Sequence, residues 1–84
     1  MLEGIVEYYQ DEEILKADGF DDAVIGIDTQ TMRLIYSVTR CVEILVVDGM
    51  DVEEAIEYFD FNVAGAYMGD QTPIFVTSWG ELDG

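Results

Sequence analysis

The sequence from Asp51 to Gly69 constrains the fold most strongly, because it has the features of one capped amphipathic helix. Asp51 is a favourable N-cap residue, and Glu54 three positions later completes a capping-box pattern. Gly69 suits the left-handed position that ends a helix. Apolar residues recur between these ends at helical spacing: Val52, Ala55, Ile56, Phe59, Val63, Ala66 and Tyr67. Such a stripe must be buried against other elements, so the segment predicts a helix on a folded core.

Patterns elsewhere in the chain predict the remaining elements. Residues 1–19 form an N-terminal helical segment, read as one helix or two short ones. Ser37 is placed to N-cap a second helix that runs to Val47. Apolar alternation on either side of the polar turn 28–31 predicts a β-hairpin. The residues that alternate on one face are Ala23, Ile25 and Ile27 in the first run and Met32, Leu34 and Tyr36 in the next. The segment PIFVT, which begins at Pro73, predicts a last strand at a sheet edge, because proline cannot donate to a strand ladder.

The predicted fold class is α+β, with the element order α-β-β-α-α-β. The chain has 84 residues, which is the size of one small domain. We expect a small antiparallel sheet, made of the hairpin and the C-terminal edge strand, with the helices packed on one face. Residues 20–76 hold the hairpin, two helices and the final strand, and residues 77–84 form a tail.

The charge balance limits the partners of the chain. It has 19 acidic and 3 basic residues, which give a formal net charge of −16. Nucleic acids and anionic membranes repel such a chain, so direct binding to either is not expected. A basic protein is permitted as a partner. The acidic surface has two interpretations, a solvated surface that maintains solubility and a nucleic-acid mimic that occupies a basic site on a DNA- or RNA-binding protein.

The residues needed for common catalytic chemistry are missing from the sequence. The chain has no histidine, and Cys41 is its single cysteine. Histidine-activated nucleophiles and histidine metal sites are therefore excluded. No phosphate-binding glycine loop occurs, and the acids near glycine do not follow the order of a calcium loop. We expect a protein that is not an enzyme and that has no metal and no cofactor.

Asn62 and Gly65 are unusual residues for the apolar side of a helix. We expect Asn62 to be a buried amide that fixes the turn before the last strand, because an unsatisfied buried amide would cost about 1–3 kcal/mol. Gly65 would admit a neighbouring helix or a second copy of the chain. In the alternative interpretation, Asn62, Tyr67 and Thr72 line a pocket for a small ligand.

Aromatic residues add candidates for an interface. Tyrosine suits half-buried contact surfaces, and a tryptophan in a polar tail is unusual. We therefore take Gly65, Tyr58 and Trp79 as a candidate interface. A chain of this size gains buried area by association, so a homo-oligomer is expected and a dimer is favoured.

Residues 20–76 resemble a group of small acidic proteins encoded by phages or by prophage-derived regions of bacterial genomes. The shared pattern is an EEA-E helix, an aromatic residue before Asn, and a closing G---PI strand. The matching residues are Glu53, Glu54, Ala55, Glu57, Phe61, Asn62, Gly69, Pro73 and Ile74. No activity is assigned to this group, so the resemblance implies a phage or metagenomic origin and no mechanism.

The sequence therefore predicts a non-enzymatic protein-interaction module that self-associates and that, in a phage, would modulate a host protein. Glu3 and Glu7 lie where a signal peptide would be apolar. The longest uncharged stretch, residues 71–80, is shorter than the roughly 18 residues that span a bilayer. The expected location is the cytoplasm of the host cell.

Overall fold

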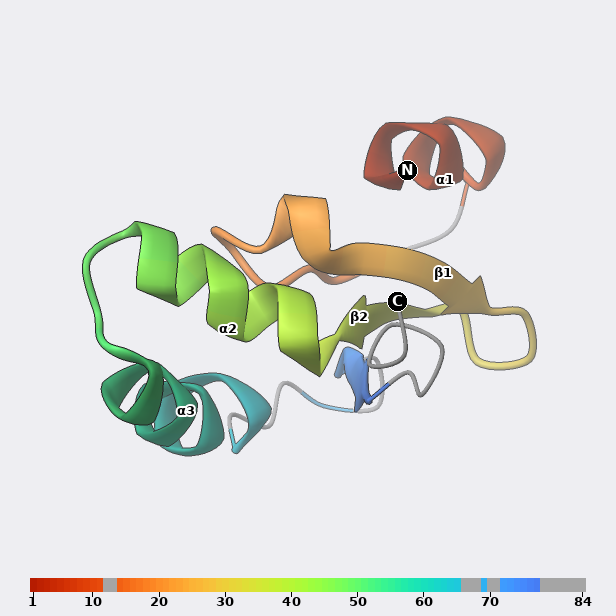
Figure 1. The fold of residues 1–84 in the computed structure, drawn as a ribbon. Coiled ribbons are helices and arrows are strands. Elements are labelled where there is room, and N and C mark those ends of the chain that lie inside the picture. The colour runs from red at the N-terminus through yellow and green to blue at the C-terminus, as the bar shows by residue number, and fades with distance from the viewer. Residues whose placement is uncertain (12–13, 66–68, 70–71, 78–84) are drawn as a thin grey trace.

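The computed structural model describes residues 1–11, 14–65, 69 and 72–77. The described part is an α+β fold with a small three-stranded sheet, which confirms the predicted fold class (Figure 1). A 3₁₀ turn before the first strand and a π-helical turn after the last helix were not predicted. The elements are α1 (Leu2–Tyr8), η1 (Asp21–Ala23), β1 (Val24–Asp28), β2 (Arg33–Ser37), α2 (Val38–Val47), α3 (Val52–Phe59), η2 (Asp60–Ala64) and β3 (Ile74–Val76).

The sheet is mixed, and this corrects the prediction of an antiparallel sheet. The strand order is β1-β2-β3; β1 and β2 are antiparallel, whereas β2 and β3 are parallel. Parallel neighbours need a long crossover connection, and here the chain passes through α2, α3 and η2 between β2 and β3. The two helices return the chain to the end of the sheet from which β2 started, so β3 runs in the same direction as β2.

A β-bulge in β1 changes the predicted alternation of the hairpin. The Cα partners are Val24 with Tyr36, Gly26 with Ile35, Ile27 with Leu34, and Asp28 with Arg33. The register shifts between Val24 and Gly26, so one residue of β1 has no counterpart on β2. The prediction that Ala23, Ile25 and Ile27 share one face is therefore wrong. The bulge instead brings Val24 and Ile27 to the side of the sheet that carries Tyr36 and Leu34.

Local start signals correctly located α2 and α3. The Ser37 hydroxyl accepts a hydrogen bond from the Arg40 N–H at 3.2 Å, and the Asp51 carboxylate accepts one from the Glu54 N–H at 2.8 Å. At the N-terminus, α1 ends at Tyr8, so helix covers much less of segment 1–19 than predicted. Among the described residues of that segment, 9–11 and 14–19 contain no second helix.

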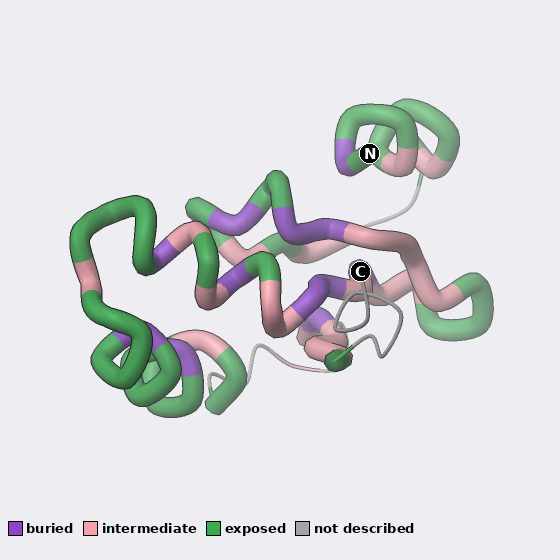
Figure 2. The backbone as a smooth tube through the Cα atoms, in the orientation of Figure 1, coloured by how far each residue is buried: buried purple, intermediate pink, exposed green. Residues whose placement is uncertain are grey.

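The core lies between the sheet, α2 and α3, where buried positions from these elements converge (Figure 2). Phe75 of β3 connects the two layers. Its ring centroid lies 5.4 Å from that of Tyr36 on β2 and 5.2 Å from that of Phe59 on α3. The buried residues of the described part are Leu2, Phe20, Ala23, Val24, Leu34, Tyr36, Ser37, Cys41, Leu45, Ala55, Phe59 and Pro73.

Candidate functional site

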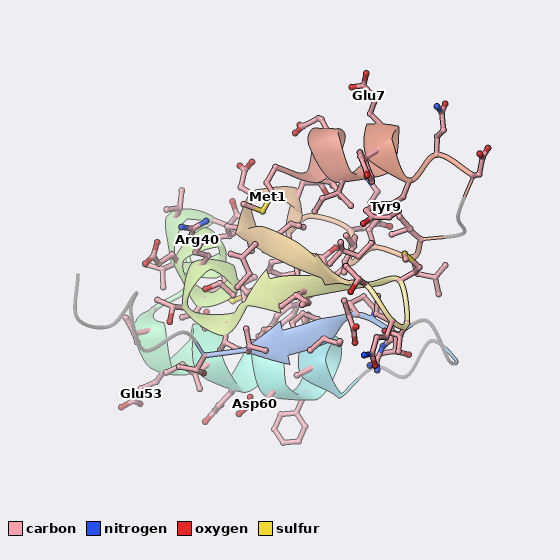
Figure 3. The ribbon with its side chains drawn as sticks, turned by 90° about the vertical axis from the view of Figure 1, so that its right-hand side faces the viewer. Met1, Glu7, Tyr9, Arg40, Glu53 and Asp60 are labelled. Carbon is pink, nitrogen blue, oxygen red and sulfur yellow. The ribbon has the colours of Figure 1, made fainter. Side chains whose placement is uncertain are left out.

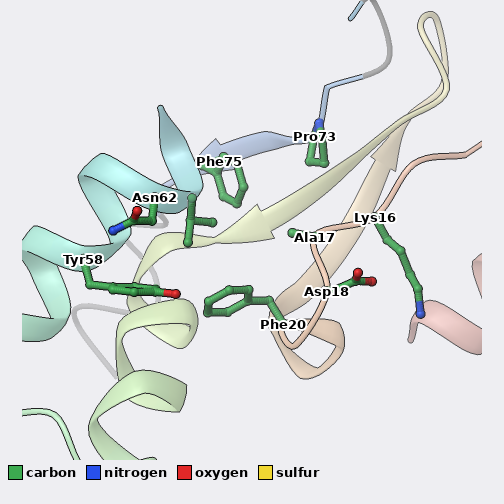
Figure 4. Close-up of a pocket in the computed structure, with 9 residues that line it drawn as sticks. Lys16, Ala17, Asp18, Phe20, Tyr58, Asn62, Pro73 and Phe75 are labelled. Carbon is green, nitrogen blue, oxygen red and sulfur yellow. The ribbon is translucent and has the colours of Figure 1, made fainter. Parts of the chain in front are cut away.

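A cavity of about 250 Å³ opens where three segments meet: residues 16–20, the end of α3 with η2, and the start of β3 (Figure 4). These segments are distant in sequence, and the fold brings them around one space. The described residues that line it are Lys16, Ala17, Asp18, Phe20, Tyr58, Asn62, Val63, Pro73 and Phe75.

Three aromatic side chains form the apolar walls of this cavity. Phe20 is buried, and Phe75 is held from behind by its contacts with Tyr36 and Phe59. Tyr58 is 42% exposed, so one of its sides remains open to solvent. Two walls are therefore fixed by core packing, and the third lies at the mouth.

The polar groups of the cavity lie at its edges. Asn62 lies on η2 at one side of the cavity. Asp18 lies on the loop before Phe20 at the other side, and its carboxylate is directed to the Lys16 side of this loop, away from the rings (Figure 4). The Lys16 side chain points away from the rings, and its ammonium lies 3.6 Å from the Asp21 carboxylate. This ion pair partly offsets the positive charge of Lys16 near the cavity.

One hydrogen bond fixes the loop that forms the floor of the cavity. The backbone N–H of Ala17 donates to the Tyr36 hydroxyl at 2.8 Å, and Tyr36 is fully buried. Burial raises the pKa of Tyr36, and the negative charges of Asp21 and Asp18 act in the same direction. The hydroxyl therefore stays protonated at neutral pH and holds residues 16–20 against the sheet.

A second long-range contact fixes the turn before β3. The Arg33 Nε–H donates to the Thr72 carbonyl at 2.5 Å, and the Thr72 hydroxyl donates to the Gly69 carbonyl at 2.7 Å. The Thr72 side chain is thus used within the turn, and Thr72 is not among the described lining residues of the cavity. The role of Arg33 was missed, since a contact across 39 positions leaves no local signal.

Asn62 is not the buried amide that was expected, and the described part places no neighbouring helix against Gly65; the approach of a second copy at Gly65 stays a prediction. Asn62 is exposed, so it is not a buried amide that fixes the turn. It lies in η2, whose wider π-helical geometry departs from the regular helix on which the prediction was based. A Cβ atom at Gly65 would lie 3.1 Å from the Asp60 carbonyl oxygen and 3.4 Å from that of Phe61. The close approach at Gly65 therefore comes from its own turn and not from a neighbouring helix.

Of the other predicted site residues, one lines the cavity and two lie outside the described residues. Tyr58, predicted at an interface, lines the cavity beside Asn62. Tyr67 and Trp79 lie outside the described residues. Phe20, Asp18 and Phe75 were missed as cavity residues, because nothing in the local sequence distinguishes them from core or loop positions.

The outer side of α3 carries exposed apolar residues. Val52 and Ile56 are one helical turn apart and are 57% and 45% exposed. Glu53, Glu57 and Asp60 follow the neighbouring row at spacings of four and three residues. The side chains of Glu53 and Asp60 point outward from this side of the molecule (Figure 3). We call these five residues the α3 surface.

Neither a metal centre nor a reactive thiol is found in the described part. No cluster of three or more potential metal-binding side chains occurs among residues 1–11, 14–65, 69 and 72–77. Cys41 is buried, and burial raises the pKa of its thiol to about 12, so the unreactive protonated form dominates at neutral pH. No helix in the described ranges is long and apolar enough to cross a membrane.

Comparison of the chain with protein families, curated proteins and solved structures finds no match. The site must therefore be interpreted from its own geometry and charge.

Proposed function

We propose that this protein is a non-enzymatic interaction module that binds a basic protein partner through the α3 surface. The observation that carries this proposal is the exposure of Val52 and Ile56 in a well-formed helix whose opposite side is buried in the core. Two neighbouring apolar side chains of this size release water when a partner covers them. The absence of histidine from the sequence supports a non-enzymatic role.

The carboxylates beside the apolar pair define the chemistry of the partner. Glu53, Glu57 and Asp60 would meet basic side chains at the rim of the contact, where charge complementarity gives specificity and speeds association. The formal net charge of −16 adds long-range attraction to any basic surface. This attraction weakens as salt shortens the screening length, which is about 8 Å at physiological ionic strength. If the chain comes from a phage, as its resemblance implies, the partner would be a host protein.

Self-association is the second candidate, and the same exposed apolar pair supports it. An isologous dimer through α3 would bury Val52 and Ile56 of both copies. It would also bring two acidic rows together, and like charges in contact oppose association. Light scattering measures this candidate directly: a dimer mass would support self-association, whereas a monomer mass would leave the α3 surface free for a basic partner.

A nucleic-acid mimic is a more specific form of the main proposal. The spacing of Glu53 and Glu57 on α3 and Asp60 at the start of η2 supports it, since acids on one side of a helix can occupy phosphate positions in a basic site. Under this hypothesis, duplex DNA and the protein compete for the same partner. Release of the captured partner by added DNA would distinguish the mimic from a partner with no nucleic-acid site.

Affinity capture from a bacterial lysate tests the α3 surface. The tagged protein is compared with the double variant Val52→Thr/Ile56→Thr, in which β-branched side chains are retained but become polar. Val6→Thr is the matched control, because Val6 lies on α1 and is 48% exposed. We expect the double variant to lose a partner that the parent protein and Val6→Thr both retain. Equal capture by all three proteins would refute the role of α3.

A further inference from the structure

We propose that the cavity between residues 16–20, α3–η2 and β3 receives the phenyl ring of Phe61 from a second copy of this chain. Phe61 lies on η2, one residue before Asn62 of the cavity lining. When each copy inserts its ring into the other, the two copies form a symmetric dimer. The inference goes beyond the proposed function, because Val52 and Ile56 are not among the described lining residues of the cavity.

Phe61 is the one exposed phenylalanine of the chain. The chain has 4 phenylalanines, and the side chains of Phe20, Phe59 and Phe75 are buried or half-buried. Phe61, in contrast, is 82% exposed. It is the second residue of the π-helical turn Asp60–Ala64, a kind of turn that is frequent at functional sites. A partner that covers this ring releases the water around it, which favours association.

The cavity matches a phenyl ring in size and in chemistry. Its volume is about 250 Å³, and an apolar cavity of about 150 Å³ is enough to hold benzene. Phe20, Tyr58 and Phe75 surround the space, and aromatic rings pack favourably against one another edge to face (Figure 4). Phe75 is held by rings at 5.2 and 5.4 Å, so little free energy is lost in ordering this wall.

The ring and the cavity lie close enough together on one copy for reciprocal insertion. Tyr58 and Asn62 line the cavity, and they lie three residues before Phe61 and one residue after it. A two-fold contact uses the same patch on both copies, so the inserted ring and the receiving cavity must belong to one patch. The segment 58–62 meets this condition, because it carries both.

Charge and direction argue against other occupants. A carboxylate or phosphate would enter against a net charge of −16. A cation would find no carboxylate among the rings, because the Asp18 side chain is directed away from them, toward Lys16 (Figure 4). An uncharged ring meets neither obstacle. The chain itself presents such a ring beside the cavity, so we assign the cavity to a second copy.

The response of the dimer to salt tests this assignment. Repulsion between two copies of charge −16 opposes the dimer. Raising salt from about 0.1 M to about 1 M shortens the screening length from about 10 Å to about 3 Å. We expect sedimentation equilibrium to show a dimer whose dissociation constant falls over this range, whereas capture of a basic partner would weaken. A monomer mass at about 1 mM protein in both salt concentrations would overturn the proposal.

Substitution of the exposed ring locates the contact. Phe61→Ala should raise the dissociation constant of the dimer about a hundredfold, or about tenfold for each inserted ring. Tyr8→Ala is the matched control, because Tyr8 lies on α1 and is 79% exposed, and it should leave the dimer unchanged. Val52→Thr/Ile56→Thr should also dimerise like the parent protein. A dimer that survives Phe61→Ala but is lost in the α3 variant would reject the cavity and support association through α3.

A mixing experiment tests the insertion itself. Ala17→Leu places a larger side chain in the cavity lining, so this variant keeps its ring but has a smaller cavity. Phe61→Ala keeps the cavity but has no ring. Neither variant alone can make an insertion, whereas a mixed pair can make one. We therefore expect the mixed pair to associate about tenfold more tightly than either variant alone, measured by fluorescence anisotropy with one labelled variant. Equal association of all three pairs would refute insertion.

Isotope-filtered NMR provides a measurement that does not depend on the folding of a variant. In a mixture of labelled and unlabelled parent protein, we expect intermolecular contacts between the Phe61 ring of one copy and the Phe75 ring of the other. A dimer without these contacts would overturn the assignment of the cavity. The proposed function has its own test, because capture of a basic partner is measured at low salt with the α3 variant.

Discussion

Replacing Tyr36 with phenylalanine removes one oxygen atom from the centre of the fold and leaves the ring in place. The lost hydroxyl is the acceptor for the Ala17 N–H at 2.8 Å, the contact that holds the cavity loop against the sheet. The aromatic contact with Phe75 should persist, since it depends on the ring. The substitution therefore tests the hydrogen bond and the loop position without creating a cavity in the core.

The expected cost follows from the fate of the Ala17 N–H. An orphaned buried donor costs about 1–3 kcal/mol. Ala17 is half-buried, so water can reach part of this group, and we expect the lower part of that range, about 1–2 kcal/mol. For a domain of 60–100 residues, each 1 kcal/mol corresponds to about 4–8 °C in Tm. The variant should therefore unfold about 4–16 °C below the parent protein.

Thermal unfolding by circular dichroism measures this difference, and amide hydrogen exchange at Ala17 shows where it arises. Tyr8→Phe is the matched control, because Tyr8 is 79% exposed. The control should leave the Tm unchanged. An unchanged Tm for Tyr36→Phe, with Ala17 exchange as slow as in the parent protein, would refute the assigned role of this hydrogen bond.

Two further predictions concern a helix cap and the buried thiol. Asp51→Ala should lower the free energy of unfolding by about 1 kcal/mol, whereas Asp51→Asn should lower it much less, because asparagine also caps helices. Urea denaturation measures the free energy of unfolding of both variants. An equal loss in the two variants would contradict the capping role of Asp51. Burial raises the pKa of Cys41 from 9.0 to about 12, so its contribution to stability is fully present below pH 9 and is lost as the pH rises toward 12. Urea titrations across this range should show a steeper loss in the parent protein than in Cys41→Ala, and parallel curves would contradict the assignment.

The helix starts could be predicted because they depend on local hydrogen bonds. The direction of β3 and the bulge in β1 were missed because they depend on pairing between distant segments. Ser37 and Asp51 act through N–H groups three residues away, so their signals are contained in a short window of sequence. The direction of β3 depends on how α2 and α3 pack between it and β2, which no short window contains. The bulge after Val24 was similarly hidden, because uninterrupted alternation fits the same apolar residues equally well.

At Gly65 a correct observation was assigned to the wrong neighbour within the chain. The sequence identified it as a position where another backbone comes close, and the Asp60 carbonyl oxygen is indeed 3.1 Å from the site of a Cβ atom. That oxygen belongs to the π-helical turn in the same segment. Because a regular helix does not bring the carbonyl at i−5 to this position, the prediction looked for a neighbouring helix. The π-helical turn therefore accounts for the close approach at Gly65 without a neighbouring helix.

The sequence predicted only part of the cavity, because only one of its lining residues gives a local signal. Asn62 attracted attention because a polar amide interrupts an apolar stripe, and the structure places it at the cavity edge. Phe20 and Asp18 carry no such local conflict, since an aromatic residue after a glycine turn fits an ordinary core position. Their role arises because Tyr36 holds Ala17 from 19 positions away. The loop that carries Phe20 and Asp18 is held beside the sheet by this contact, and no short window of sequence contains both of its ends.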